Sequence, residues 1–80
     1  MATVIVVAGV DVALADDESF NKVRHRVTNA RRMLIDYELG NITAEDFQPF
    51  HELSFKSSDG GRVFLPVDKI VFVHNDKPKD

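Results

Sequence analysis

The chain has no cysteine and no tryptophan, and it contains only three prolines and four glycines among its 80 residues. Without cysteine, neither a disulfide nor a thiolate metal site can stabilise the fold. No apolar run approaches the length of about 20 residues that crosses a bilayer as a helix, so we expect no membrane span. A single domain of this size has a net stability of only about 3–5 kcal/mol, and oligomerisation would add to it.

The residue patterns that carry catalysis are also missing. The three histidines do not share the i, i+3 or i, i+4 spacing of a helical metal pair. No serine lies in a nucleophile elbow, and Gly60-Gly61 follows a turn pattern rather than opening a helix, which excludes a phosphate loop. The acidic cluster at 16–18 precedes a helical pattern, where it suits the helix dipole. We therefore expect a protein that is not an enzyme and needs no metal or cofactor.

The charge balance is mildly acidic, with a formal net charge of −3. This sign disfavours bulk attraction to nucleic acid or to anionic membranes. Residues 1–15 end in Ala13-Leu14-Ala15, as a signal peptide would, but Asp11 interrupts the apolar stretch and no basic segment precedes it. We expect a cytoplasmic protein with no membrane partner.

Several short segments have the composition and alternation of β-strands. Residues 3–8 and 10–14 are rich in β-branched side chains and predict a hairpin that turns near Ala8-Gly9. Residues 51–56 and 62–65 flank a glycine-containing turn, and Pro66 separates the second of them from a last strand at 69–74.

One long amphipathic pattern lies between these strands. Apolar residues at spacings of three and four predict a helix over about 17–39, capped by Asp16 or Asp17. Thr43 and Asp46 resemble a capping box and predict a short helical turn at 44–47, ended by Pro49.

The element order is therefore ββα, a short helical turn, then ββ(β). This order predicts an α+β fold, in which an antiparallel sheet of four to five strands has one long amphipathic helix packed on one face. We expect a single domain over 1–75 and a frayed tail at 76–80.

The first and last strands are apolar on both faces. A helix is about 10 Å wide and covers about half of a sheet that is roughly 20 Å wide. The uncovered half would be an exposed apolar patch, which is typical of an interface. We expect a homo-oligomer, with a dimer as the first choice, unless the sheet curls strongly and covers itself as a small half-barrel. The predicted partner and oligomer interface comprises Val4, Ile5, Val6, Val7, Ile70, Val71, Phe72 and Val73.

The predicted helix holds the main concentration of basic residues in the chain. Such a face can contact nucleic acid or an acidic partner, or it can simply be a solvated helix surface. The basic residues fall on both flanks of the helix rather than in one stripe, which favours the solvated surface. The candidate contacts are Lys22, Arg24, Arg26, Arg31 and Arg32.

Two segments resemble known families. The stretch Gly61–Val73 is similar to the ending of a family of short actinobacterial proteins of unknown function, and a phage-encoded protein of this kind is also conceivable. The segment Thr3–Arg32 resembles part of the FlbD family of flagellar regulators, with its halves in the other order, whereas Leu39–Phe50 departs from both. These resemblances imply a fold but transfer no functional residue.

The leading hypothesis from the sequence is a non-catalytic interaction module that is homo-oligomeric and acts by binding another macromolecule, an unknown protein. One alternative is a nucleic-acid-binding protein that uses the arginine-rich helix. A second alternative is a small-ligand-binding protein with a pocket at a subunit interface.

Overall fold

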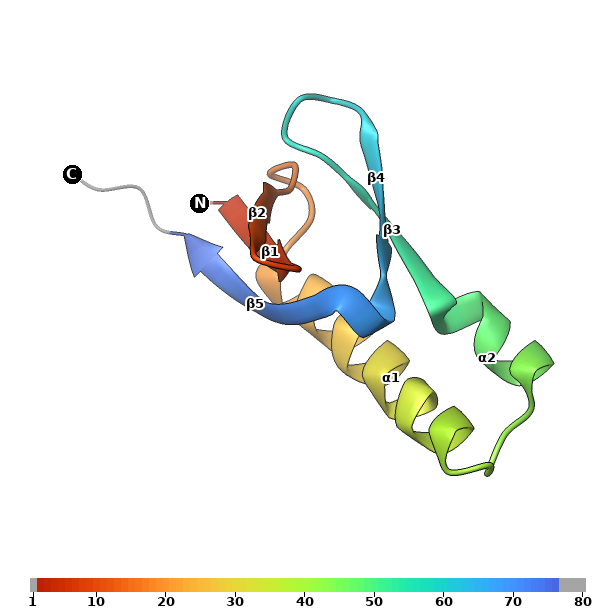
Figure 1. Ribbon diagram of the computed structural model, residues 1–80. Helices are drawn as coiled ribbons and strands as arrows, with labels where there is room; N and C mark the ends of the chain where they lie inside the picture. The colour runs from red at the N-terminus through yellow and green to blue at the C-terminus, as the bar shows by residue number, and fades with distance from the viewer. Residues whose placement is uncertain (1, 77–80) are drawn as a thin grey trace.

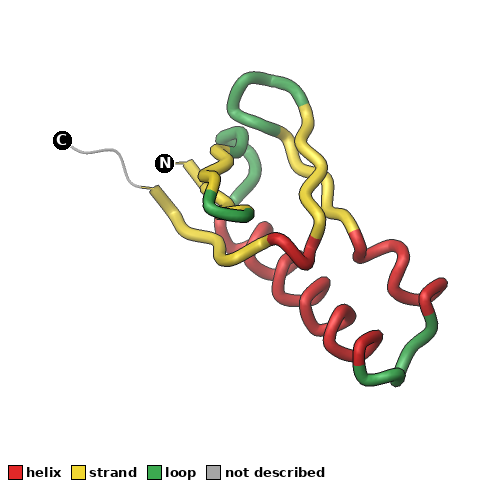
Figure 2. Tube along the Cα trace, in the orientation of Figure 1, coloured by secondary structure: helices red, strands yellow, loops and turns green. Residues whose placement is uncertain are grey.

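The computed structural model of the protein describes residues 2–76, which form an α+β fold as the element order predicts (Figure 1). Strands lie on one side of the long helix, and a second, shorter helix lies beside the far end of the first (Figure 2). The elements are β1 (Ala2–Val7), β2 (Val10–Ala13), α1 (Phe20–Glu38), α2 (Ala44–His51), β3 (Glu52–Lys56), β4 (Arg62–Pro66), the 3-10 turn η1 (Val67–Lys69) and β5 (Ile70–Asp76).

The predicted N-terminal hairpin is confirmed. β1 and β2 pair antiparallel, with Val7 opposite Val10 across the two-residue turn Ala8-Gly9. Both turn residues have positive φ, 49° and 84°, as a tight hairpin turn of the I′ type requires. β5 pairs antiparallel with the other edge of β1, so the strand order of this sheet is β2-β1-β5.

The prediction of one sheet is wrong, because β3 and β4 form a separate two-stranded antiparallel sheet. The two sheets touch at one corner, where Leu14 bridges to Ser57 and the Ala15 N–H donates to the Lys56 carbonyl at 2.9 Å. β2 has only four residues and cannot extend this bridge into a full ladder. The five strands therefore form two separate sheets that share one core, rather than one sheet or a single half-barrel.

α1 is the predicted long helix, but it begins later than expected. Its N-cap is Ser19, whose hydroxyl accepts a hydrogen bond from the Lys22 N–H at 3.4 Å, rather than Asp16 or Asp17. Beyond its last turn, Gly40 has a φ of 79°, which ends the helix as glycine commonly does.

α2 is longer than the single turn expected from the sequence. Thr43 and Asp46 form the predicted capping box, with hydrogen bonds of 3.2 and 3.3 Å in the two directions. Pro49 lies inside the helix instead of ending it. The helix continues to His51 because its apolar side packs inward: Phe47 is buried and Phe50 packs against the core.

The core lies between the two sheets and α1. Every strand except β2 contributes to it, and Leu14 enters it directly after β2. The predicted last strand extends to Asp76, which the sequence assigned to the tail, and residues 77–80 lie outside the described residues. The buried cluster comprises Ile5, Leu14, Val23, Val27, Ala30, Phe47, Leu53, Phe55, Leu65, Val67 and Ile70.

Replacing the largest fully buried side chain tests this core. Phe55 has no exposed surface, and we expect Phe55→Ala to cost about 3–5 kcal/mol through lost burial and a cavity. That cost is comparable to the whole stability of a domain this small, so the variant should show the circular dichroism of an unfolded chain. The matched control is Phe64→Ala, because Phe64 is 61% exposed and its variant should remain folded. Equal unfolding of both variants would contradict this core.

Candidate interaction surfaces

The eight apolar residues predicted to form an interface divide between the two faces of β1 and β5. On the inner face, Ile5 lies opposite Val73 and Val7 lies opposite Ile70. Ile5 and Ile70 are buried in the core cluster, and Val7 and Val73 pack against it. This half of the predicted interface is therefore occupied within the chain itself.

The outer face of the same strands carries the other residues. Val6 lies opposite Phe72 and Val4 lies opposite His74. Val4 is buried although it does not belong to the core cluster, and it lies between Ala13 of β2 and His74 of β5 in the sheet. The rings of Phe72 and His74 lie 5.5 Å apart.

Two apolar residues of β5 remain open to solvent. Phe72 is 50% exposed and Val71 is 51% exposed, at a point where the register of β1 and β5 shifts by one residue. Together with the half-buried Val6 and His74 they form an exposed surface, here called the outer patch. Its members come from two paired strands, so the sheet holds them in a fixed arrangement.

β5 is an edge strand of its sheet. The hydrogen bonds between β1 and β2 show which backbone groups of β1 point toward β5, and therefore which groups of β5 point away from the sheet. The Leu14 N–H donates to the Thr3 carbonyl at 2.9 Å, so the backbone of Thr3 points away from β5. Because polar backbone groups alternate in direction along a strand, those of Val4 and Val6 point toward β5 and bond to His74 and Phe72. The backbone N–H and carbonyl of Val73 consequently point to the outer edge of β5.

The basic residues of α1 have two different roles. The Arg26 guanidinium donates to the Ser54 carbonyl at 3.0 Å and lies 4.4 Å from the centre of the Phe55 ring. On the opposite flank, the Arg31 guanidinium donates to the Val71 carbonyl at 3.2 Å. These two arginines fasten α1 to β3 on one side and to β5 on the other.

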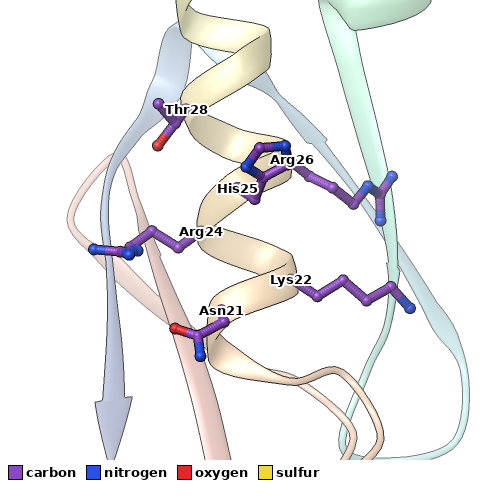
Figure 3. Close-up of a pocket in the computed structure, with 6 residues that line it drawn as sticks. All are labelled: Asn21, Lys22, Arg24, His25, Arg26 and Thr28. Atoms are coloured by element: carbon purple, nitrogen blue, oxygen red, sulfur yellow. The ribbon is translucent and has the colours of Figure 1, made fainter.

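The remaining basic side chains spread around the outside of the helix. Lys22 pairs with Glu18 at 3.5 Å, Arg24 lies 5.7 Å from the centre of the Phe20 ring, and Arg32 makes no hydrogen bond or ion pair with the described residues. Figure 3 shows Arg24 directed to one flank and Lys22 and Arg26 to the other. The hollow that they border is lined by α1 alone, so no second element walls it.

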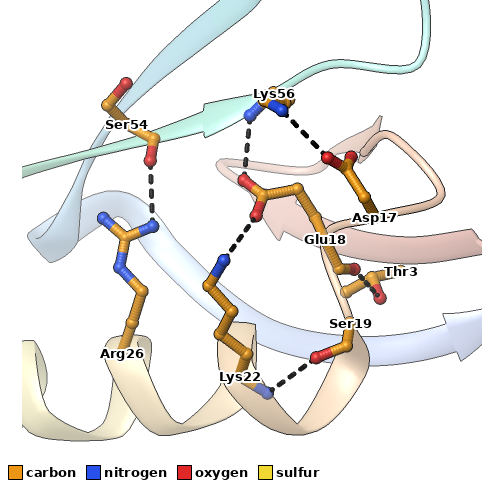
Figure 4. A network of polar contacts seen from close by, with 8 residues as sticks. All are labelled: Thr3, Asp17, Glu18, Ser19, Lys22, Arg26, Ser54 and Lys56. Carbon is orange, nitrogen blue, oxygen red and sulfur yellow. Dashed lines mark hydrogen bonds and ion pairs between the residues drawn. The ribbon is translucent and has the colours of Figure 1, made fainter.

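A buried carboxylate that sequence reasoning took as part of a capping cluster joins three elements (Figure 4). Glu18 accepts a hydrogen bond from the Lys56 N–H at 2.9 Å, and its own carbonyl accepts from the Thr3 hydroxyl at 2.9 Å. Beside it, Lys56 donates to Asp17 at 2.9 Å and lowers the pKa of that exposed carboxyl. Glu18 therefore links β1, the start of α1 and β3. No local sequence pattern predicts this role, because its partners Thr3 and Lys56 are distant in the sequence.

A shallow groove between α1 and α2 was also missed from the sequence. Its volume is about 600 Å³, and its floor is the Tyr37 ring stacked on Phe47 at 5.1 Å. His51 meets Phe47 edge to face at 5.8 Å. Aromatic residues on separate helices are brought together here by the αα turn, so spacing within one helix could not reveal the groove.

Comparison of the chain with protein-family models, with curated proteins and with solved structures found no match. Among residues 2–76, no helix has the length and apolar character needed to cross a membrane. In the same part of the chain, no three histidine, aspartate or glutamate side chains gather in a way that could hold a metal ion.

The two roles of the arginines can be separated by mutation. We expect Arg26→Gln to cost about 1–2 kcal/mol, because the Ser54 carbonyl loses its charged donor and the Phe55 ring loses its cation. In a domain of this size that lowers Tm by at least about 4 °C, measurable by thermal denaturation. Arg32→Gln is the control and should change stability by less than about 0.5 kcal/mol. Equal shifts in the two variants would contradict the fastening role of Arg26.

Proposed function

We propose that this protein is a small, non-catalytic interaction module that self-associates and acts by binding another macromolecule through the outer patch. The observation that carries the proposal is the exposure of Val71 and Phe72, side by side on an edge strand, while the inner face of the same strand is buried. Single exposed apolar residues are common on protein surfaces, but adjoining ones on a rigid sheet are typical of binding surfaces.

The shape of the patch supports a macromolecular partner. Its residues lie on a sheet face and a strand edge, where an extended backbone or a flat surface can dock. Phe72 supplies a large aromatic side chain beside the ring of His74, and phenylalanine is among the residues enriched in protein interfaces.

Charge supports the same choice over nucleic acid. The protein carries a net charge of −3, and Arg26 and Arg31, two of its five candidate nucleic-acid contacts, are engaged with backbone carbonyls. The three other contacts, Lys22, Arg24 and Arg32, are exposed on the same helix, and Figure 3 shows Lys22 and Arg24 directed to opposite flanks. Nucleic-acid surfaces usually present their basic residues as a continuous patch or stripe.

Self-association is tested by the mass of the protein in solution. We expect light scattering coupled to size exclusion at micromolar concentrations to give a mass above the 9.0 kDa of one chain. A mass of one chain at every concentration would contradict the self-association.

The binding of a further macromolecule is tested by comparing variants on an affinity column. We expect a protein from the host that is retained by the wild type and by Phe64→Ser, but not by Phe72→Ser. Both substitutions remove a phenylalanine that is at least half exposed, so the pair controls for loss of apolar surface in general. Equal retention by the two variants would exclude the outer patch as the binding surface.

The nucleic-acid alternative is tested by fluorescence anisotropy with labelled DNA and RNA at low salt, where phosphate contacts are strongest. We expect no binding. Affinity that falls as salt rises, and that weakens in the double variant Arg24→Ala, Arg32→Ala, would favour the arginine-rich helix instead.

A further inference from the structure

We propose that two copies of this chain join through the outer edge of β5, antiparallel and centred on Val73, to make one six-stranded sheet. This inference rests on the proposed self-association. It adds that β5 is the strand through which the two copies of the chain pair. Among the described strands β5 pairs only with β1, so no other described strand lies along its second edge.

The edge of β5 carries few of the features by which proteins protect edge strands, and its register shift lies near one end, beside Val71, rather than at Val73. Proline, lysine and very short strands are the usual protection. β5 has seven residues and contains neither lysine nor proline. Arg31 bonds to the Val71 carbonyl near one end of the strand, two residues before Val73.

The other edges of the two sheets are protected. β4 has five residues and is bounded by Arg62 and Pro66, and proline supplies no N–H for a new ladder. β2 has four residues, and the segment that follows it is bonded to Lys56 and Ser57 at the corner of the two sheets. On the outer edge of β3, the Ser54 carbonyl accepts from Arg26, and the Lys56 N–H and carbonyl bond to Glu18 and Ala15. Of the four edges, β5 is the longest.

Antiparallel pairing of β5 with itself satisfies the backbone in a symmetric way. The N–H and carbonyl of Val73 point outward, so Val73 can exchange two hydrogen bonds with the partner's Val73 about a two-fold axis. The axis is perpendicular to the sheet, so α1 of both copies lies on one face and the outer patch of both copies lies on the other.

This register also brings the exposed aromatic rings of the two copies together on the outer face. With Val73 on the axis, Phe72 stands directly opposite the partner's His74, and His74 stands opposite the partner's Phe72. Phe72 and His74 already lie 5.5 Å apart within one chain. The two copies together form a group of four rings on the outer face, in place of two half-exposed phenylalanines.

The absence of cysteine allows a direct test of the register. Residues opposite each other at a non-hydrogen-bonded position have Cα atoms about 4.5 Å apart, within the range of a disulfide. We expect a mixture of the single variants Phe72→Cys and His74→Cys to form the mixed disulfide several-fold faster than either variant forms a disulfide with itself. Phe64→Cys mixed with His74→Cys is the control and should show no such preference. Equal rates in all mixtures would overturn the register.

Two substitutions test the edge without a cross-link. Val71→Lys adds a charge at the edge of β5, and we expect it to shift the mass measured by light scattering toward one chain. Val10→Lys is the matched control, because Val10 is 62% exposed on β2, away from this edge. Circular dichroism of both variants verifies that they are folded.

The outcomes separate the inference from the function on which it rests. A wild-type dimer that persists unchanged in Val71→Lys and shows no preferred mixed disulfide overturns pairing through β5 and leaves self-association standing. A wild-type mass of one chain overturns both.

Discussion

The packing of α1 against both sheets is the interaction on which the rest of the structure depends. The two sheets share only one bridge at a corner, so neither supports the other through a continuous ladder. α1 joins them, because Val23, Val27 and Ala30 belong to the same buried cluster as residues from both sheets. A two-stranded ribbon such as β3–β4 is at best marginally stable by itself, so its structure depends on this shared core. Without disulfides, no covalent link replaces the packing.

The charges of α1 serve this packing as much as they serve solubility. Arg26 and Arg31 leave opposite flanks of the helix and bond to carbonyls of β3 and β5. A guanidinium carries several donors on a long apolar stem, so it can reach over a helix and still cover a ring such as Phe55. Glu18 completes the arrangement at the start of the helix, where its carboxylate meets the backbone of Lys56. Part of the basic pattern that suggests ligand binding therefore has a structural role, because these two arginines hold α1 against the strands.

Local patterns allowed much of the fold to be predicted, and long-range geometry accounts for what they missed. The hairpin at Ala8-Gly9 and the amphipathic α1 follow from turn chemistry and from a period of three to four residues. The division into two sheets depends on where strands distant in sequence meet, which no local pattern encodes. The buried Glu18 was misread for the same reason, since its partners are the distant Thr3 and Lys56.

The candidate site was predictable only in part because apolar alternation does not say which face is covered. The pattern of β1 and β5 predicts an interface on both faces, yet the core takes Ile5 and Ile70, and Val4 is buried within the chain as well. The predicted interface residues that stay exposed are Val71 and Phe72 on the edge strand β5. A flat central strand with the same residues would have buried Phe72 between neighbours, so its exposure is a consequence of the place of β5 in the strand order. The topology, rather than the composition of the strand, therefore places β5 at the edge of this sheet, where we propose that a partner adds.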